Sequence, residues 1–373
     1  MAATTDRDEF VRLTDPYRRE LLAHCYRMLG SVDDAEDLVQ ETYLRAWRSY
    51  DGYEGRASLR TWLHRIATNT CLTALEGRVR RPLPSGLGEP SDAPEEPLRA
   101  RAADVPWLQP LPDALVDPAT VVAARGSLRL ALVATLQNLP ARQRAVLILR
   151  DVLAWRAPEV AALLGTSTAA VKSTLQRARA RLDEVAPDED LVTEPDGPED
   201  RELLDRYMAA FEHADMDALL GLLQDGVELE MPPYLEWFSG TKDVLRFLGA
   251  RVGEPGRVRM VPTRANGQRA VGAYERGADG VHRAHSLQVL HVRLLHAPRA
   301  LDVHAPRALD VHAPRALDVH APRAHLVHAP SALGVRGVHS SRAPGVHEVR
   351  IARITAFLDP ELFGRFGLPQ VLS

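Results

Sequence analysis

The sequence predicts a multi-domain protein in which two all-α domains are followed by one α+β domain. Residues 7–81 and 119–184 carry apolar side chains at helical spacing, and they are separated by a segment rich in proline and glycine. After residue 201, helical patterns give way to stretches that alternate between apolar and polar residues, as half-buried strands do. A chain of 373 residues is long enough for two or three such domains.

The composition excludes several classes of protein. The net charge of −4 means that bulk charge provides no affinity for nucleic acid, so any basic surface must be local. Two cysteines, Cys25 and Cys71, are too few for a disulfide framework or a self-contained zinc site, and we expect buried thiols and no metal or cofactor. The polar N-terminus has no signal-peptide core and no apolar run reaches membrane-spanning length, so we expect a cytoplasmic protein without membrane contact.

Changes in composition divide the chain into five segments. The expected segments are a helical domain at 7–81, a linker at 82–118, a second helical domain at 119–184, an acidic linker at 185–200, and an α+β domain at 201–373 that contains a repetitive insertion at 295–346. The acidic linker carries seven carboxylates between residues 186 and 200 and no basic side chain, which favours an extended conformation.

The first helical domain contains an acidic helix at residues 31–48. Ser31 followed by Asp34 is typical of a helix N-terminus. One apolar stripe is predicted from Ala35, Leu38, Val39, Thr42, Ala46 and Trp47. The other faces carry Asp33, Asp34, Glu36, Asp37 and Glu41. Like charges on adjacent turns repel each other, so this surface is either a solvated acidic face or the docking site of a basic partner.

A basic helix follows, beginning near Leu59 after the turn at Gly55–Ser58. Its local positive charge comes from Arg56, Arg60, Arg65, Arg78, Arg80 and Arg81. These arginines could bind phosphates, although arginines near a helix C-terminus are also favoured by the helix dipole. Trp62 is expected in the core and not as a stacking platform for bases.

The second helical domain ends in a helix-turn-helix pattern at residues 158–182. Gly165 supplies the turn and Ser167 the N-cap of the second helix, whereas Ala157 is a poor N-cap for the first. The buried stripe of the second helix is Val171, Leu175, Ala178 and Leu182. The basic and amide side chains off this stripe can reach the major groove, which favours DNA binding over an ordinary helical hairpin.

Together the two helical domains resemble a known family. DAEDLVQETYLRAW followed by GRASLRTWLHRIATN resembles region 2 of the sigma-70 family, and LPARQRAVLILRDVLAW followed by EVAALLGTSTAAVKSTLQRAR resembles region 4. The order and the spacer without a region 3 are similar to the extracytoplasmic-function (ECF) sigma factors. The spacer stretch VPWLQPLPDAL and the long C-terminal tail resemble the SigG-like branch, whose C-terminal domain is SnoaL-like.

The resemblance implies partners and site residues. The partners would be core RNA polymerase, through its β′ clamp and β subunits, and promoter DNA, while an anti-sigma factor stays unknown. The residues that would bind polymerase are Asp37, Gln40 and Glu41. Those that would hold the −10 element are Arg56, Ser58, Arg60, Arg65 and Asn69. Those that would read the −35 element are Lys172, Ser173, Gln176, Arg177 and Arg179.

The C-terminal block is expected to form helices at 201–223 and 242–252 and a curved antiparallel sheet, similar to the SnoaL-like or NTF2-like cone. Polar residues that could line a cone are Glu228, Glu230, His282, His285 and Asp359. Exposed positions on a half-solvated sheet explain them as well, and they form no convincing acid/base pair. We expect no enzymatic activity, and by resemblance this domain would tune the activity of the sigma regions.

The octamer HAPRALDV occurs three times without change at residues 296–319. A proline in every eighth position prevents a continuous helix, and histidines eight residues apart do not match a metal site. The flanking stretches HSLQVLHVR and VRIARITAFL are predicted to be consecutive strands. The repeat is therefore expected to be a disordered insertion in a hairpin, dispensable for function.

Three functions remain open at this point. The first is a promoter-specificity factor that acts with core polymerase. The second is a helix-turn-helix regulator that binds DNA alone, which leaves the acidic helix at residues 31–48 without a role. The third is an NTF2-like enzyme carried by a DNA-binding N-terminal half, which lacks a visible catalytic constellation. Transcription that depends on both a promoter and core polymerase would separate the three.

Overall fold

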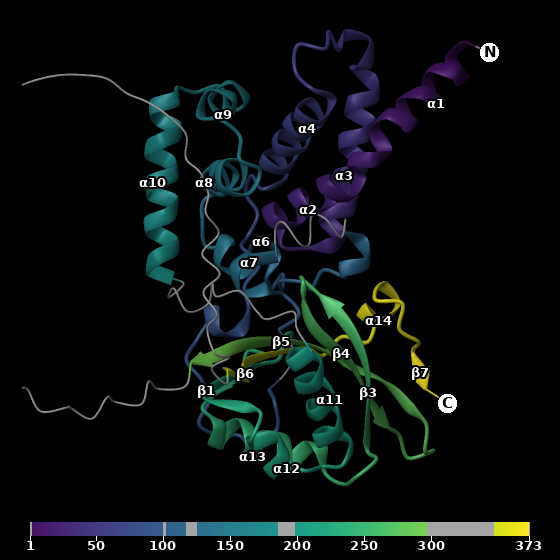
Figure 1. Ribbon diagram of the computed structural model, residues 1–373, viewed down its shortest axis with the longest axis vertical. Coiled ribbons are helices and arrows are strands. Elements are labelled where there is room, and N and C mark those ends of the chain that lie inside the picture. The colour runs from purple at the N-terminus through teal and green to yellow at the C-terminus, as the bar shows by residue number, and fades with distance from the viewer. Residues whose placement is uncertain (1, 100–101, 117–124, 186–197, 297–346, 373) are drawn as a thin grey trace, which may run out of the picture. The chain divides into compact units, whose positions relative to one another are not determined.

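The structure is a computed structural model that describes residues 2–99, 102–116, 125–185, 198–296 and 347–372 (Figure 1). The first group of helices is α1 (Ala2–Thr14), α2 (Arg18–Leu29), α3 (Val32–Arg48) and α4 (Leu59–Ala74). Helices α2, α3 and α4 pack on one another around a core that includes Leu21, Met28, Val39 and Leu63. None of the helices in the described ranges is both long and apolar enough to cross a membrane.

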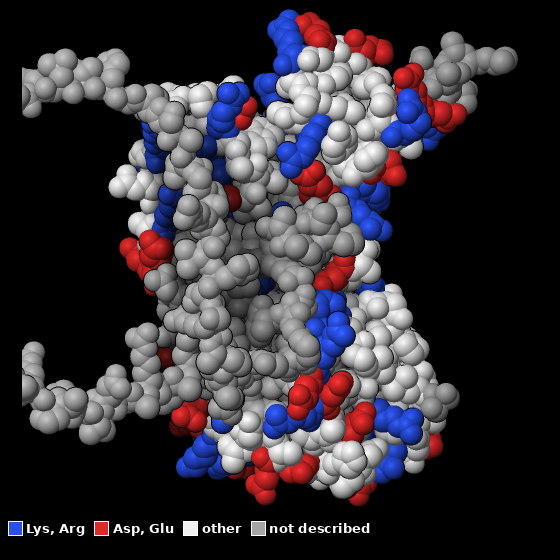
Figure 2. Space-filling view, in the orientation of Figure 1, with Lys and Arg blue, Asp and Glu red and all other residues white. Residues whose placement is uncertain are grey.

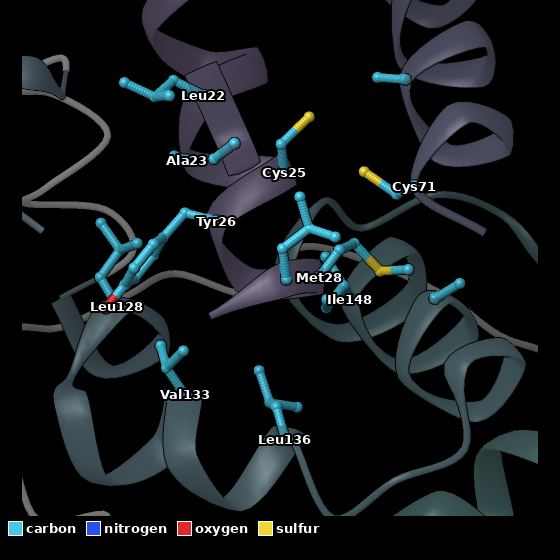
Figure 3. Packing of buried hydrophobic residues seen from close by; sticks show 14 of the residues in the cluster. Leu22, Ala23, Cys25, Tyr26, Met28, Cys71, Leu128, Val133, Leu136 and Ile148 are labelled. Carbon is cyan, nitrogen blue, oxygen red and sulfur yellow. The ribbon is translucent and has the colours of Figure 1, made fainter. Parts of the chain in front are cut away.

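Cys25 and Cys71 are fully buried in this core, as the sequence predicts (Figure 3). A hydrogen bond with Cys25, together with burial, raises the pKa of the Cys71 thiol, so both side chains act as small apolar residues. Trp47, which the predicted stripe places in the core, is instead 38% exposed. Its ring packs edge-on against Phe10 of α1, at 5.2 Å between centroids, because Trp47 lies in the last turn of α3.

Serine caps fix the first turns of α3 and α4. Ser31 Oγ accepts the backbone N–H of Asp34 at 3.2 Å, and Ser58 Oγ accepts that of Thr61 at 3.2 Å. Gly30, which ends α2, adopts a φ of 70°. A Cβ at this position would lie 2.8 Å from the Leu108 side chain, so both backbone conformation and space demand glycine here.

The second group of helices is α6 (Arg125–Leu128), α7 (Leu130–Leu136), α8 (Ala141–Leu147), α9 (Ala157–Leu164) and α10 (Thr168–Val185), and a π-helical turn at Ile148–Val152 continues α8. The helix-turn-helix forms as predicted. Gly165 caps α9 at a φ of 61°, and Ser167 Oγ accepts the N–H of Ala170 at 3.1 Å.

The N-terminus of α9 differs from the expectation. The cap position is Arg156 and not Ala157, which is the first residue of the helix. The Glu159 carboxylate accepts the backbone N–H of Arg156 at 2.7 Å and pairs with its guanidinium at 2.8 Å. A carboxylate at the third helical position thus compensates for the missing hydroxyl.

The C-terminal domain is a mixed sheet with helices. Its elements are α11 (Pro198–Glu212), α12 (Met216–Leu220), β1 (Leu223–Glu230), β2 (Trp237–Ser239), α13 (Thr241–Val252), β3 (Val258–Ala265), β4 (Gln268–Arg276), β5 (His282–His296), β6 (His347–Phe357), α14 (Leu362–Arg365) and β7 (Val371–Leu372). The strand order is β2-β1-β6-β5-β4-β3, and β7 pairs with β5. Helices α11, α12 and α13 lie against this sheet (Figure 1).

Two expectations about this sheet have different outcomes. The sheet is not antiparallel throughout, because β1 pairs with β6 in parallel, Leu229 beside Ile354. Strands β5 and β6, which flank the repeat, are neighbours as predicted. The expected disorder of the insertion falls almost wholly on residues 297–346, which lie outside the described residues.

Candidate functional site

The acidic face of α3 is partly neutralised by arginines that are distant in sequence. Asp34 accepts hydrogen bonds from Arg78 at 2.9 Å and Arg81 at 2.7 Å. Arg365, from the short helix α14 of the C-terminal domain, pairs with Asp33 and lies 3.6 Å from Glu36. The charge repulsion along the first two turns of α3 is therefore relieved within the chain itself.

The linker also binds the start of α3. The side-chain oxygen of Gln109 accepts hydrogen bonds from Ser31 Oγ at 2.9 Å and from the backbone of Val32 at 2.8 Å, while its amide donates to Asp33 at 2.8 Å. These contacts satisfy N–H groups that a helix N-terminus leaves without partners. The sequence reasoning missed Gln109 and Arg365, because nothing in the local pattern marks either residue.

The residues expected to bind polymerase lie further along α3. Asp37 and Gln40 are exposed, and among the described residues no cation pairs with Asp37. Glu41 is half-buried and pairs with Arg45 on the next turn at 2.6 Å. The three side chains recur at positions i, i+3 and i+4, so they share one side of the helix. This side keeps negative charge available to a basic partner.

The five residues expected at the −10 element differ in their exposure to solvent and in their hydrogen-bond and ion-pair partners. Arg65 and Asn69 are exposed one turn apart on α4, and Arg56 is exposed in the preceding loop, where it pairs with Glu54. Ser58 caps α4, and the guanidinium of Arg60 is held by the Glu20 carboxylate, with one hydrogen bond of 2.9 Å. Arg60 and Ser58 thus have structural roles, whereas the other three are open to a ligand.

Aromatic rings lie beside the loop that precedes α4. Tyr53 packs on Trp62 with 4.9 Å between centroids, and Tyr50 lies 6.4 Å from each of them. The Tyr53 hydroxyl donates to the carbonyl of Ala57 at 2.5 Å, which holds the loop against the rings. Trp62 is half-buried, so it is less deeply buried than the expected core position and less exposed than a stacking surface for bases would be.

Two buried histidines, His24 of α2 and His64 of α4, lie between these helices. His24 and His64 are fully buried with 5.4 Å between ring centroids. Thr68 donates its only hydroxyl proton to the His64 carbonyl, so the contact of 2.9 Å from His24 Nε2 to Thr68 must be donated by the histidine. Burial lowers the pKa of both rings, and the Glu20 carboxylate opposes this at His64 without reversing it.

Helix α10 presents all five residues expected to read the −35 element. Lys172, Ser173, Gln176, Arg177 and Arg179 are exposed, while Val171, Leu175 and Ala178 are buried as predicted. Basic side chains gather along the surface of α10 (Figure 2). The Arg179 guanidinium makes two hydrogen bonds with Asp151, at 3.0 and 2.7 Å, which orient it. Lys172 and Arg177 have no carboxylate partner among the described residues.

A hairpin of the C-terminal domain joins the N-terminal helices to the linker. Asn266, at the turn between β3 and β4, is 1% exposed. Its amide donates to Tyr26 Oη of α2 and to the carbonyl of Leu128 of α6, both at 2.8 Å, and its oxygen accepts the N–H of Leu111 in the linker at 2.8 Å. Tyr26 and Leu128 lie side by side in this junction (Figure 3). One side chain thus contacts three separate parts of the chain.

Neighbouring residues extend this junction. Asp113 in the linker pairs with Arg264 at 3.1 Å and accepts the N–H of Gly267 at 2.7 Å. The backbone N–H of Leu130, at the start of α7, donates to the side chain of Gln268 at 2.9 Å. These groups are buried or half-buried, so their hydrogen bonds are shielded from water.

Polar residues that could have formed a catalytic site are engaged in ion pairs and hydrogen bonds within the chain. Glu228 pairs with Arg353 at 2.6 Å, and His282 bonds to the carbonyl of Gly256 at 3.0 Å. Glu230 is fully buried and accepts the N–H of Ser85 in the linker at 3.0 Å. The expectation of exposed positions is therefore wrong for Glu230 and for His282, which is 7% exposed.

Two further candidates give no cluster either. His285 lies 3.6 Å from Glu275, and Asp359 caps the turn before α14 by accepting the N–H of Glu361 at 3.0 Å. In the parts of the chain that the structure describes, no group of three histidine, cysteine or carboxylate side chains could hold a metal ion.

Comparisons with known families agree with the two resemblances. The family model of Sigma-70 region 2 matches residues 13–81, and that of Sigma-70, region 4 matches residues 129–182. The chain is 54% identical over 305 residues to the ECF RNA polymerase sigma factor SigG of Mycobacterium tuberculosis (strain ATCC 25618 / H37Rv), which covers 79% of this chain and 82% of SigG.

A second relative and a solved structure extend the likeness over the C-terminal domain. The ECF RNA polymerase sigma factor SigJ of Mycobacterium tuberculosis is 31% identical over 274 residues, covering 71% of this chain and 80% of SigJ. The crystal structure of SigJ matches with a TM-score of 0.57 at 23% identity, covering 96% of this chain and 99% of that one. At that identity the structural match indicates a shared fold.

Proposed function

The chain belongs to the extracytoplasmic-function sigma factors of the sigma-70 family, and from this premise we propose how its parts divide the work. As a member of this family it directs promoter recognition and transcription initiation by RNA polymerase, and it is not an enzyme. Binding of core polymerase and promoter DNA comes with that function. We further propose which residues bind polymerase and DNA and what the C-terminal domain does. We place the action of the protein in the cytoplasm.

We assign polymerase binding to Asp37, Gln40 and Glu41. Their exposure on one side of α3 supports this assignment, together with the negative charge that Asp37 retains. The partner surface would be the β′ clamp, with the β subunit as a second contact. Substitution of these residues should weaken binding to core polymerase and leave the fold intact, since Asp37 and Gln40 are exposed and Glu41 is only half-buried.

We assign the −10 element to α4 and its preceding loop, and the −35 element to α10. Arg56, Arg65 and Asn69 are the accessible contacts near the −10 strand, and Ser58 and Arg60 position them through the cap and the pair with Glu20. On α10, Lys172 and Arg177 are the strongest candidates for contacts with bases or phosphates, because no carboxylate of the described residues neutralises them.

We propose that the domain at residues 201–373, which we take to be SnoaL-like, modulates the sigma regions by docking on them. The observation that carries this proposal is the contact of Asn266 with Tyr26, Leu111 and Leu128. A second contact, of Arg365 with Asp33 and Glu36, lies one turn from the proposed polymerase site on α3. In the docked state, this domain would therefore occupy space next to the polymerase site and reduce the negative charge of α3 that polymerase would otherwise meet.

Promoter-dependent transcription with purified core polymerase and the full chain tests both levels of the proposal. The double substitution Lys172→Ala and Arg177→Ala should abolish transcription from promoters with a −35 element while retaining binding to core polymerase. Unchanged transcription would contradict the assignment of α10. DNA binding that needs no polymerase would instead favour an independent regulator.

The substitution Arg365→Ala tests the docking contact. A partly exposed ion pair contributes about 0.5–1 kcal/mol, so we expect roughly 2- to 5-fold more transcription at subsaturating protein. The matched control is Arg283→Ala, which removes an exposed pair with Asp279 elsewhere in the same domain and should change nothing. Equal output of both variants would contradict modulation through this contact.

A further inference from the structure

The C-terminal domain contains a cavity of about 390 Å³ between its sheet and two helices, partly open to solvent and with a volume in the range of small-molecule sites. Apolar side chains form most of its wall, among them Phe211 of α11, Phe247 and Leu248 of α13, and Leu229 and Ile354 of the sheet. These residues also belong to the core of the domain. The domain thus keeps an open volume within a well-formed apolar core.

A neutral polar cluster lines the same cavity. Tyr207, Ser286 and Gln288 are 0%, 3% and 7% exposed. The Tyr207 hydroxyl donates to Gln288 Oε1 at 2.7 Å, so the direction of the Gln288 amide is set, with its nitrogen toward Ser286. The contact from Gln288 Nε2 to Ser286 Oγ is long, at 3.4 Å.

This cluster can therefore offer donors to a ligand. The amide nitrogen of Gln288 carries two N–H groups, of which the described residues engage one at that long distance. The hydroxyl of Ser286 rotates freely between donor positions. None of the three cluster residues carries a charge. The wall also contains the ionisable residues Arg251, Arg257, Glu275 and His285. Their partners lie within the chain, because Arg257 pairs with Glu275 at 2.6 Å, His285 lies 3.6 Å from Glu275, and Arg251 donates to carbonyls of the linker. A ligand that matches the unengaged donors therefore has an apolar body and a neutral hydrogen-bond acceptor, such as a ketone, ester or amide carbonyl.

The wall of the cavity includes the linker between the two sigma regions. Leu98 of the linker is one of the lining residues. Arg251, which also lines the cavity, stacks on the Phe247 ring at 3.6 Å and donates to the carbonyls of Pro94 at 3.0 Å and Glu96 at 2.8 Å. Movement of α13 upon ligand entry would therefore act directly on the linker.

Other contacts hold the linker along the same domain. Trp237 Nε1 donates to the carbonyl of Gly88 at 2.9 Å, and Arg246 pairs with Glu95 at 2.5 Å. With Glu230 holding Ser85, the linker is fastened over residues 85–99. Because this segment connects the helices that bind polymerase and the −10 element to the helix-turn-helix, its position sets their separation.

We propose that this cavity is a sensory site for a small apolar molecule with a neutral carbonyl acceptor, bound by Ser286 and Gln288, and that its occupancy is transmitted to the sigma regions through linker residues 94–98. The transmission rests on the proposed function of the C-terminal domain, whereas binding itself does not. Binding uses a preformed cavity. Coupling requires only that the contacts between the C-terminal domain and the linker differ in stability with and without bound ligand.

The test of binding uses prodan, a neutral naphthalene ketone whose emission shifts to the blue in apolar surroundings. Titration of the full chain should give a saturable blue shift with one site per chain. Ala250 is exposed at the cavity wall on α13, so Ala250→Trp should place an indole in the cavity without replacing a core side chain, and should weaken prodan binding at least about tenfold. Ser286→Ala should weaken it roughly 3- to 10-fold through the lost donor.

The matched control is Ala218→Trp, on the exposed surface of α12 and outside the cavity, which should bind prodan as the wild type does. Thermal unfolding of each variant separates loss of binding from loss of folding. No saturable binding by the wild type, or equal binding by the folded Ala250→Trp variant, would overturn the site.

The test of coupling is amide hydrogen exchange of the linker in the full chain. Prodan should change the protection of peptides that span residues 85–99 in the wild type and not in Ala250→Trp. Binding with unchanged protection would overturn the transmission and leave the site standing. Failure of the proposed function would be visible separately, as absence of promoter-dependent transcription with or without prodan.

Discussion

The junction at Asn266 allows the docking of the C-terminal domain to be tested with one substitution. Asn266 and Gly267 have φ values of 59° and 73°, as the central residues of a tight hairpin turn require. Asn266→Gly keeps this backbone conformation and removes only the side chain. The backbone N–H of Asn266, which donates to the carbonyl of Leu111 at 2.8 Å, is kept. The perturbation is therefore confined to three side-chain hydrogen bonds.

The size of the effect follows from the groups that lose a partner. The Tyr26 hydroxyl still donates to the carbonyl of Gln109 at 2.7 Å, so its proton remains bonded. The N–H of Leu111 and the carbonyl of Leu128 lose the bonds with Asn266 in a buried setting, at about 1–3 kcal/mol each. The docked state should be destabilised by about 2–6 kcal/mol, or roughly 30- to 20,000-fold in the docking equilibrium.

Amide hydrogen exchange at Leu130 reports this equilibrium. Its N–H donates to Gln268, a bond that the substitution does not touch, so faster exchange signals separation of the hairpin from α7. The N–H of Val133 bonds to the carbonyl of Arg129 and serves as an internal reference for the stability of the helix. We expect Leu130 to exchange at least about tenfold faster relative to Val133.

Arg283→Ala, at the start of β5, should leave both rates unchanged. If Leu130 in Asn266→Gly exchanged as slowly as in the wild type, the junction would not hold the domain in place, and the proposed modulation would lose its structural basis.

Further predictions concern the helices themselves. Asp37→Arg should weaken the affinity for core polymerase roughly 5- to 50-fold, with a smaller effect at high salt, and equal affinity by titration of labelled core would contradict the assignment. Lys172→Ala and Arg177→Ala should each lower by about one the slope of log affinity against log salt for promoter DNA bound to the holoenzyme; an unchanged slope would place both side chains away from phosphates. His24 and His64 have lowered pKa values in the folded state, so their contribution to stability is present above the unfolded pKa of about 6.5 and is lost as the pH falls below it. The melting temperature should therefore drop between pH 7 and 5, and His24→Gln should reduce this drop; a pH-independent melting temperature would show that folding does not lower the pKa of these rings.

Local features of the sequence predicted most of the helices and several of their ends, although the helix expected at 201–223 is divided into α11 and α12. Ser31 and Ser167 cap helices as the sequence predicts, α4 begins at Leu59 directly after the predicted turn, and Gly165 supplies the turn of the helix-turn-helix. Each of these signals involves partners three or four residues away, so the neighbouring sequence determines it. The family resemblance was readable for the same reason, because both motifs consist of continuous segments that the family models match.

The docking contacts depended on the tertiary structure. Asn266 and Tyr26 are 240 positions apart, and Arg365 and Asp33 are 332 apart, so no local pattern could pair them. The cavity of the C-terminal domain and its linker wall also arise from elements that meet only after folding. The sequence by itself indicated most of the helices and the family to which the chain belongs, because helix formation and the family motifs both depend on residues that are close together in the sequence. The partial neutralisation of α3 and the attachment of the linker depend on the packing of segments that are far apart in the sequence, which only the tertiary structure shows.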